Sequence, residues 1–364
     1  MTRIEPYSDK EVKFVLENLL KDKEFLNFVK ENLNSSTSKF LSIPGSKFLA
    51  LQLFKSKVRK ISTIDQFQDQ VMIVLKSVIN QTMDKFSYSG ADLLDINKPY
   101  LFIGNHRDIT LDSALCNYAI HSTGLKTTHN AIGDNLVSID WMGDLLRLNK
   151  SFVVPRSGKS KKEIYNNLFN VSNYIKSTLN AGNHIWIAQR QGRAKDGIDK
   201  TDPAVLKMLH IALRKSANFE DLTKYYNIIP CSVSYEFDPL AKEKAKQVTD
   251  AKNKKEQDDI KHIFKGIMEH KGFVHLNIGE QITGSYSPED LAKEIDQSII
   301  GNYKIWDTNM YAYKYLHEQV NDKDFPRASS YFNELRTSMT NKELEYIMNQ
   351  YSNPLIAKGE FKNE

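Results

Sequence analysis

The sequence has no apolar run near ~20 residues, the length that a membrane-spanning helix requires. Its first residues, MTRIEPYSDKE, lack the apolar segment of a secretory signal peptide. Cysteine is scarce, with two in 364 residues, and Cys116 and Cys231 both stand among apolar neighbours. We therefore expect no spanning helix and two buried free thiols, as in a cytoplasmic protein.

Several familiar ligand-binding signatures are missing as well. The chain has no zinc-ligand spacing, no Walker loop, no GxGxxG turn and no internal repeat. Its net charge of +5 permits contact with phosphate or anionic lipid but does not indicate nucleic acid. These absences direct attention to side chains that could act without a metal or a dinucleotide.

The chain has a globular composition, with 26% charged and 40% hydrophobic residues. Helix caps and helical spacing over residues 8–95 predict a helical N-terminal region, which we bound at residues 1–97. Over residues 98–300, short apolar runs alternate with helical segments, which predicts an α/β domain with a mixed, mostly parallel sheet flanked by helices. Residues 301–364 are aromatic and helical, and predict a C-terminal helical cap.

Two polar stretches each permit two interpretations. Residues 46–61 mix apolar bulk with five basic side chains, which suits either a segment resting on a membrane surface or a helix packed on the protein with solvated lysines. Residues 239–271 are dense in Lys, Glu and Asp, and suit either a solvated helical insertion or an interaction arm. We favour packing for the first stretch and a solvated insertion for the second.

Six apolar runs predict strands, at residues 100–103, 126–132, 151–154, 184–188, 226–237 and 273–278. The first of them leads into Asn105 and His106, with Asp108 and Asp112 close behind. An imidazole titrates near neutrality and a carboxylate can fix its tautomer, so a His with an acid at a strand end suits general-base work. The plainer interpretation is that His106 caps the next helix while the acids offset its dipole.

Basic side chains recur where three predicted strands end, namely Arg107, Arg156, Arg190, Arg193 and Lys195. Ligands of open α/β sheets bind outside the carboxyl ends of the strands, where these cations would converge beside His106. Guanidinium groups hold phosphate through paired hydrogen bonds. Gly192 and Gly197 would allow the backbone to approach closely. The pattern predicts a phosphate site.

Together these stretches resemble the glycerolipid acyltransferase superfamily, which includes glycerol-3-phosphate and 1-acyl-glycerol-3-phosphate acyltransferases. The family's first motif, N-H-x4-D, is matched by Asn105, His106 and Asp112, but five residues separate His and Asp here instead of four. Either the turn holds an extra residue or Asp108 takes the supporting role, and we expect Asp112 to do so.

The other motifs of the family are matched in part. Residues 151–156 resemble the second motif, a strand that ends in an arginine, here Arg156. Residues 187–194 resemble the third motif, with Gln191 in place of its glutamate and without its threonine. Pro230 within an aliphatic strand matches the fourth. The resemblance covers about residues 99–300.

The resemblance implies an enzyme of phospholipid biosynthesis. Such an enzyme moves a fatty acyl group from acyl-CoA or acyl carrier protein to a hydroxyl of 1-acyl-glycerol-3-phosphate or glycerol 3-phosphate. His106 would be the general base and Asp112 its support. The implied substrate-binding residues are Arg156, Arg190, Gln191, Gly192, Arg193 and Lys195. No metal and no bound cofactor are implied, because the acyl thioester is a co-substrate.

The implied partners are the thioester donor, a lysophospholipid or glycerol phosphate, and a membrane surface, with no nucleic acid. The expected location is the cytoplasm, in peripheral contact with the inner face of the membrane. Three alternatives stay open: a non-catalytic lipid-binding member of the same fold, transfer to another lysolipid, and a phosphate-ester hydrolase. Gln191 and the lengthened His–Asp spacing favour the first, whereas the third lacks a second acid cluster for metals.

Overall fold

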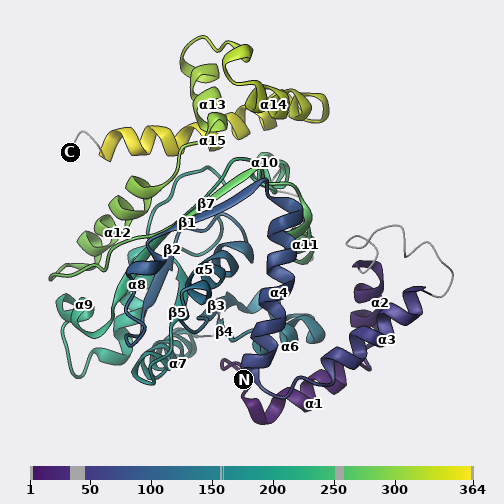
Figure 1. Ribbon diagram of the computed structural model, residues 1–364. Coiled ribbons are helices and arrows are strands. Elements are labelled where there is room, and N and C mark those ends of the chain that lie inside the picture. The colour runs from purple at the N-terminus through teal and green to yellow at the C-terminus, as the bar shows by residue number, and fades with distance from the viewer. Residues whose placement is uncertain (1–2, 33–45, 156–157, 159, 251–257, 362–364) are drawn as a thin grey trace. The chain divides into compact units, whose positions relative to one another are not determined.

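The computed structural model describes residues 3–32, 46–155, 158, 160–250 and 258–361 (Figure 1). The chain divides into two compact units. The first consists of Met1–Val74 and Ala131–Gly158, and the second of Leu75–Asn130 and Lys159–Glu364. Both segments that carry the candidate site belong to the second unit, so that unit is described at greater length.

The first unit is mainly helical, with α1 (Asp9–Leu19), α2 (Lys23–Asn32), α3 (Ser46–Val58), the first part of α4 (Ile64–Thr82) and α6 (Asp140–Leu148). The capping box predicted at Ser8 and Glu11 is present at the start of α1. Phe25 of α2 lies between two rings, with its centroid 5.8 Å from that of Trp141 and 6.3 Å from that of Phe54. Helix α3 therefore packs on α2 through Phe54, which is the packing interpretation of residues 46–61.

The sheet has seven strands: β1 (Lys85–Ser89), β2 (Leu101–Gly104), β3 (His129–Gly133), β4 (Ser151–Val154), β5 (Ile185–Ala188), β6 (Ile228–Tyr235) and β7 (Phe273–Ile278). Their order is β1-β7-β6-β2-β5-β3-β4. Strand β2 pairs in parallel with both β5 and β6, and β3 pairs in parallel with β5, whereas β6 and β7 are antiparallel. The mixed, mostly parallel sheet predicted from the sequence is confirmed.

Strand β1 corrects one expectation. Helical spacing through Phe86 predicts helix there, but α4 ends at Thr82 and residues 85–89 pair in parallel with β7 at the edge of the sheet. Strand β1 alternates polar and aromatic residues and is mostly exposed, so it lacks the apolar run that marks the other strands. The other six strands fall on the predicted runs, with the ends shifted by up to three residues.

The second unit has ten helices besides the end of α4: α5 (Leu111–Ser122), α7 (Lys161–Asn180), α8 (Pro203–His210), α9 (Leu222–Tyr225), α10 (Ala241–Thr249), α11 (Asp258–Met268), α12 (Pro288–Asn302), α13 (Asp307–His317), α14 (Pro326–Ser338) and α15 (Asn341–Phe361) among its described residues. Helix α15 packs along α13 and α10 (Figure 1). Tyr311, Phe332, Ile347 and Tyr351 belong to a hydrophobic cluster of these C-terminal helices. Residues of the expected C-terminal cap are therefore helical and share a hydrophobic cluster with α10.

The polar stretch 239–271 forms two helices, α10 and α11, but it is less solvated than we expected. Lys244 and Lys271 within it are fully buried. The Lys271 ammonium donates to Thr82 Oγ1 and to the carbonyl of Ile267, both at 3.0 Å. These bonds join the C-terminal end of α4 to that of α11. Burial lowers the pKa of Lys271 to about 8. The insertion thus packs into the unit through its lysines.

Two further expectations can be compared with the structure. Cys116 and Cys231 are both free and buried, which confirms the prediction for the thiols. No helix within the described ranges is both long enough and apolar enough to cross a membrane.

Candidate active site

The carboxyl ends of β2, β5 and β6 lie at one edge of the sheet, because the three strands are parallel neighbours. Asn105 begins the turn after β2 and is almost fully buried. Its side chain continues the ladder to β6, since Oδ1 accepts from Val233 N–H at 2.8 Å and Nδ2 donates to the Val233 carbonyl at 3.0 Å. Asn105 thereby fixes the point at which His106 leaves the sheet.

His106 and Asp112 face each other across this turn. His106 Nδ1 lies 3.2 Å from Asp112 Oδ2, and the same oxygen accepts the backbone N–H groups of Arg107 at 2.7 Å and Asp108 at 2.9 Å. A carboxylate oxygen accepts, so the ring proton lies on Nδ1 and Nε2 is left for a ligand. The His106 side chain is 17% exposed, whereas that of Asp112 is 2% exposed. The pair has the geometry of a general base with a buried acid behind it.

Asp108 has a different place from Asp112. Its Oδ1 accepts from Thr110 N–H at 2.9 Å and from Leu111 N–H at 2.8 Å, so it caps the start of α5. Burial, followed by repulsion from Asp112, raises the pKa of Asp108. The turn therefore accommodates an extra residue as a helix cap, and Asp112 is the acid that contacts His106.

Arg107 is not available for phosphate, contrary to our expectation. It is buried, donates to the Gly197 carbonyl at 3.0 Å and forms an ion pair with Asp199. Its guanidinium carbon also lies 5.0 Å from the centre of the Tyr303 ring. Although burial opposes the charge, Asp199 keeps the pKa of Arg107 above its ordinary value. Arg107 and Asp199 together join the turn after β2 to the loop after β5.

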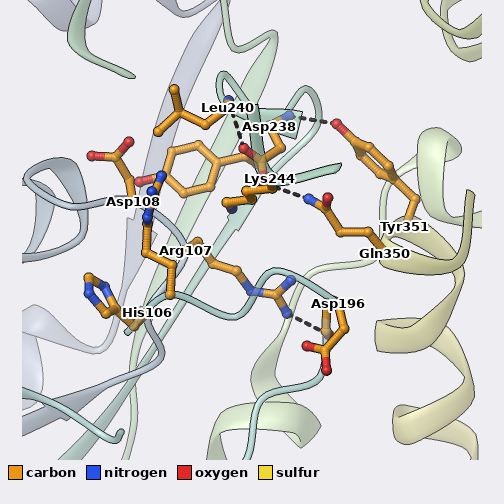
Figure 2. A network of polar contacts seen from close by, with 12 residues as sticks. His106, Arg107, Asp108, Asp196, Asp238, Leu240, Lys244, Gln350 and Tyr351 are labelled. Atoms are coloured by element: carbon orange, nitrogen blue, oxygen red, sulfur yellow. Dashed lines mark hydrogen bonds and ion pairs between the residues drawn. The ribbon is translucent and has the colours of Figure 1, made fainter. Parts of the chain in front are cut away.

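The loop after β5 lies against both the His106 turn and the C-terminal helix. The Ala194 N–H donates to the His106 carbonyl at 2.7 Å. On its other side, Asn353 Nδ2 of α15 donates to the Asp196 carbonyl at 2.8 Å. Figure 2 shows the surroundings of this loop at Asp196, with His106 on one side and Gln350 of α15 on the other. The position of the loop is thus set by two distant parts of the chain.

The network also includes a buried ion pair behind the loop. Lys244 of α10 pairs with Asp238, whose Oδ2 accepts from Gln350 Nε2 at 2.6 Å and whose N–H donates to the Tyr351 hydroxyl at 2.6 Å (Figure 2). Burial lowers the pKa of Lys244, an effect that Asp238 opposes. Removal of either member of such a buried pair would leave the other uncompensated.

Among the predicted phosphate ligands, Arg193 directly precedes Ala194, whose N–H is bonded to the His106 turn. Arg193 is partly buried, and Nη2 lies 3.4 Å from His262 Nδ1 on α11. Its Nη1 is buried and has no hydrogen-bond partner among the described residues. An unpaired guanidinium nitrogen is suited to an anionic ligand.

The remaining predicted ligands differ in position. Arg190 and Lys195 are partly exposed, and Gln191 and Gly192 are exposed. All four belong to the same loop as Arg193. Arg156 lies outside the described residues.

Three residues that the sequence analysis missed complete the site, namely Asp199, Tyr235 and His262. Tyr235 donates its hydroxyl to Asp112 Oδ1 at 3.0 Å. The only feature of the sequence that could have indicated Tyr235 is its position at the end of a predicted strand. Neither Asp199 nor His262 stands in a recognisable motif. Their parts in the site come from contacts between residues far apart in the sequence.

Asp296 anchors the loop after β5, and its burial leads to a prediction about the free energy of unfolding. Asp296 Oδ1 on α12 accepts from Thr201 N–H at 2.7 Å and from Thr201 Oγ1 at 2.6 Å, and burial raises its pKa from 3.8 to about 6. The folded state therefore holds the proton up to higher pH than the unfolded state, and this group's contribution to stability falls as pH rises from about 4 to 6. Asp296→Asn keeps the acceptor oxygen without the buried charge. We expect it to increase the free energy of unfolding at pH 8 by about 1–3 kcal/mol.

Urea unfolding at pH 8 and pH 5 would test this prediction, because the gain should fall by about half at pH 5. Asp92→Asn, at an exposed position, is the matched control and should change the free energy of unfolding by less than about 0.5 kcal/mol at either pH. An equal gain from Asp296→Asn at both pH values would contradict the assigned cause.

Comparison with known proteins identifies the class of this domain. The model of the family described as Acyltransferase matches residues 85–233, which include His106, Asp112 and the loop after β5. Residues 85–233 therefore form an acyltransferase domain, in agreement with the family expected from the sequence. The chain is also similar to the crystal structure of PlsC, the 1-acyl-sn-glycerophosphate (LPA) acyltransferase of Thermotoga maritima. That likeness has a TM-score of 0.40 and 14% identity, and covers 65% of this chain and 78% of PlsC.

No curated protein matches the sequence. Among the residues that the structure describes, no group of three or more His, Cys, Asp or Glu side chains is arranged to hold a metal ion.

Proposed function

We propose that the enzyme transfers a fatty acyl group from an acyl-CoA or acyl carrier protein thioester to a hydroxyl of a phosphorylated glycerol. The acceptor would be 1-acyl-glycerol-3-phosphate or glycerol 3-phosphate, and the product would serve phospholipid biosynthesis. The observation that carries this proposal is the partly exposed imidazole of His106 with Asp112 behind it, on a turn bonded to the loop in which Arg193 has a buried, unpaired guanidinium nitrogen. The first group suits proton removal and the second suits a phosphate.

In the proposed reaction, Nε2 of His106 takes the proton of the acceptor hydroxyl while its oxygen attacks the thioester carbonyl. Asp112 holds the Nδ1 proton at 3.2 Å and stabilises the imidazolium that forms. The C–S bond then breaks, and the thiolate leaves with the proton from Nε2. General-base assistance of this kind contributes about 10²–10⁴-fold. No bound cofactor is required in this scheme, since the thioester supplies the acyl group.

Arg193 would hold the acceptor phosphate, with Arg190 and Lys195 of the same loop assisting. The Ala194–His106 hydrogen bond ties this loop to the base at 2.7 Å, so a phosphate on Arg193 would place the hydroxyl near Nε2. Gln191 occupies the position of the family's glutamate and could bind an acceptor hydroxyl without adding negative charge. Because the acyl chain and 1-acyl-glycerol-3-phosphate are lipidic, we place the reaction at the inner face of the membrane, with the enzyme in peripheral contact.

The test is thiol release from a long-chain acyl-CoA, or from an acyl carrier protein thioester, in the presence of liposomes. Lysophosphatidate, glycerol 3-phosphate and a lysolipid without a phosphomonoester would be offered separately. We expect release that depends on a phosphorylated acceptor, and the better acceptor would be identified by its kcat/KM. Release that is equal with and without acceptor would indicate thioester hydrolysis and contradict the proposal. If none of these acceptors supported release, the proposed substrate class would be wrong.

Arg193 provides a prediction about the acceptor. We expect Arg193→Ala to raise the KM for the phosphorylated acceptor about 10–100-fold with a smaller effect on kcat, because charge-assisted hydrogen bonds to the phosphate are lost. Steady-state kinetics with varied acceptor and varied donor would measure this. Arg214→Ala removes an exposed arginine elsewhere in the unit and should leave both KM values unchanged. An effect of Arg193→Ala confined to the donor would argue against the phosphate role.

A further inference from the structure

The two oxygens of the Asp112 carboxylate have different tasks. Oδ2 faces His106 Nδ1 and two backbone N–H groups. Oδ1 accepts the hydroxyl of Tyr235, at 3.0 Å. A carboxylate held through one oxygen can still turn about its Cβ–Cγ bond, whereas bonds to both oxygens define its plane. Tyr235 is therefore placed to control which way Oδ2 points.

The packing of α5 on β6 brings Tyr235 to this oxygen. Cys231 and Tyr235 lie on one face of β6, and Cys116 and Asp112 lie one turn apart on α5. The two thiols contact each other, and the hydroxyl contacts the carboxylate, so helix and strand meet at two points. The Tyr235 side chain is 4% exposed, and all eight residues of β6 are buried. Its hydroxyl is thus held in place by the core of the sheet.

We propose that Tyr235 is a positioning residue for acyl transfer, whose hydroxyl fixes the rotation of the Asp112 carboxylate and thereby keeps Oδ2 on Nδ1 of His106. This inference rests on the proposed function of His106 as the general base. Tyr235 lies two residues beyond the end of the segment that matches the acyltransferase family, at residue 233. The support of the base is thus completed from outside that segment.

The surroundings of Tyr235 keep it a hydrogen-bond donor. Burial, followed by the negative charge of Asp112, raises the pKa of the Tyr235 hydroxyl well above its ordinary value. Asp108 and Asp238 are further acids whose charges act on Tyr235. The phenol consequently retains its proton throughout the pH range in which a histidine base works, and it donates to Asp112 over that whole pH range.

The decisive variant is Tyr235→Phe, which removes the hydroxyl and keeps the ring. We expect kcat to fall about tenfold, because a hydrogen bond to a charged group is lost at a site that acts through His106. The KM values for donor and acceptor should not change, because Tyr235 acts through Asp112 and not by contact with either substrate. The loss of the donor raises the proton affinity of the His106–Asp112 pair, so the acid limb of the pH–rate profile should move up by about half to one pH unit.

Tyr226→Phe is the matched control. Tyr226 is also buried in this unit, but its hydroxyl has no hydrogen-bond partner among the described residues. The same substitution there should leave kcat and the pH profile unchanged. Thermal melting of both variants would establish that each is folded. An unchanged kcat and pH profile in Tyr235→Phe would overturn the inference, as would a lower kcat with an unshifted profile, which would indicate a structural role only.

An NMR titration of the His106 ring separates this inference from the proposed function. Histidine-labelled wild type and Tyr235→Phe would be titrated without substrate, with the His106 signal assigned by its loss in His106→Gln. We expect the titration midpoint of the ring to move upward by about half to one unit in Tyr235→Phe. An unshifted midpoint would refute the coupling of Tyr235 to His106. Because no substrate is present, this result holds even if the acyl-transfer assays fail for every acceptor.

Discussion

Replacing His106 with alanine is expected to lower the rate of acyl transfer by about 10²–10⁴-fold, with the fold retained. The His106 side chain is 17% exposed, lies in the turn after β2 and hydrogen-bonds to Asp112, so its removal should cost packing in that turn and leave the sheet in place. The chemical step, in contrast, loses the group proposed to take the hydroxyl proton. Thiol release under saturating donor and acceptor, together with thermal melting, would measure both effects. Transfer by His106→Ala at close to the wild-type rate would refute the mechanism.

Two further variants make this experiment specific. His121→Ala removes an exposed histidine at the end of α5, the helix that carries Asp112, and should transfer at the wild-type rate. Asp112→Asn should also be slow, since it removes the charge that stabilises the imidazolium. The double variant His106→Ala with Asp112→Asn should be no slower than His106→Ala alone, because two residues that act as one unit are not additive. A multiplicative loss would show that the two side chains act independently.

Gly197→Ala is expected to have the largest effect on stability of any change in the loop after β5. Gly197 has a φ of +77°, which an L side chain adopts only with strain, and a Cβ there would lie 2.0 Å from the Gln350 carbonyl oxygen. Backbone of α15 occupies that space, so either the loop or the helix must move. We expect the free energy of unfolding to fall by about 3 kcal/mol or more, and kcat/KM for the acceptor to fall with it.

Gly192→Ala provides the control for the backbone strain alone. Gly192 has the same φ of +77°, but nothing lies within 4 Å of a Cβ built there. Its substitution should lower the free energy of unfolding by only about 1 kcal/mol. Urea unfolding of both variants would isolate the contact with α15 as the difference between them. Equal losses at Gly192 and Gly197 would mean that this contact does not hold the loop.

The parts of the fold that local patterns determine were predictable from the sequence. The six apolar runs give six of the seven strands, and for the central strands β2, β5 and β6 the reason is burial on both faces, which leaves a continuous apolar run. Helix α7 likewise begins at a local capping pattern, in which the Ser160 hydroxyl accepts from Glu163 N–H. Strand β1 was not predictable in this way, because its polar residues are stabilised by pairing with β7, which lies almost 190 residues away.

The candidate site likewise contains residues that local patterns predict and residues whose environment depends on distant contacts. The positions of His106 and Asp112 could be predicted, because a strand end and the next helix start are local features. The burial of Arg107 could not, since it depends on Asp199 and on the Tyr303 ring, roughly 90 and 200 residues further along. A basic residue at a strand end looks the same in the sequence whether it faces a ligand or a buried acid. Its partner decides between the two, and only the tertiary structure supplies that partner.

The contact between Gly197 and Gln350 also has a consequence for the order in which the protein matures. The two residues are about 150 positions apart, so at about 5–20 residues per second a ribosome produces Gln350 roughly 8–30 s after Gly197. During that interval the loop that is proposed to hold the acceptor lacks the helix behind it, even if the sheet and the His106 turn have already formed. In that case the nascent chain holds the proposed general base before it holds a rigid acceptor loop.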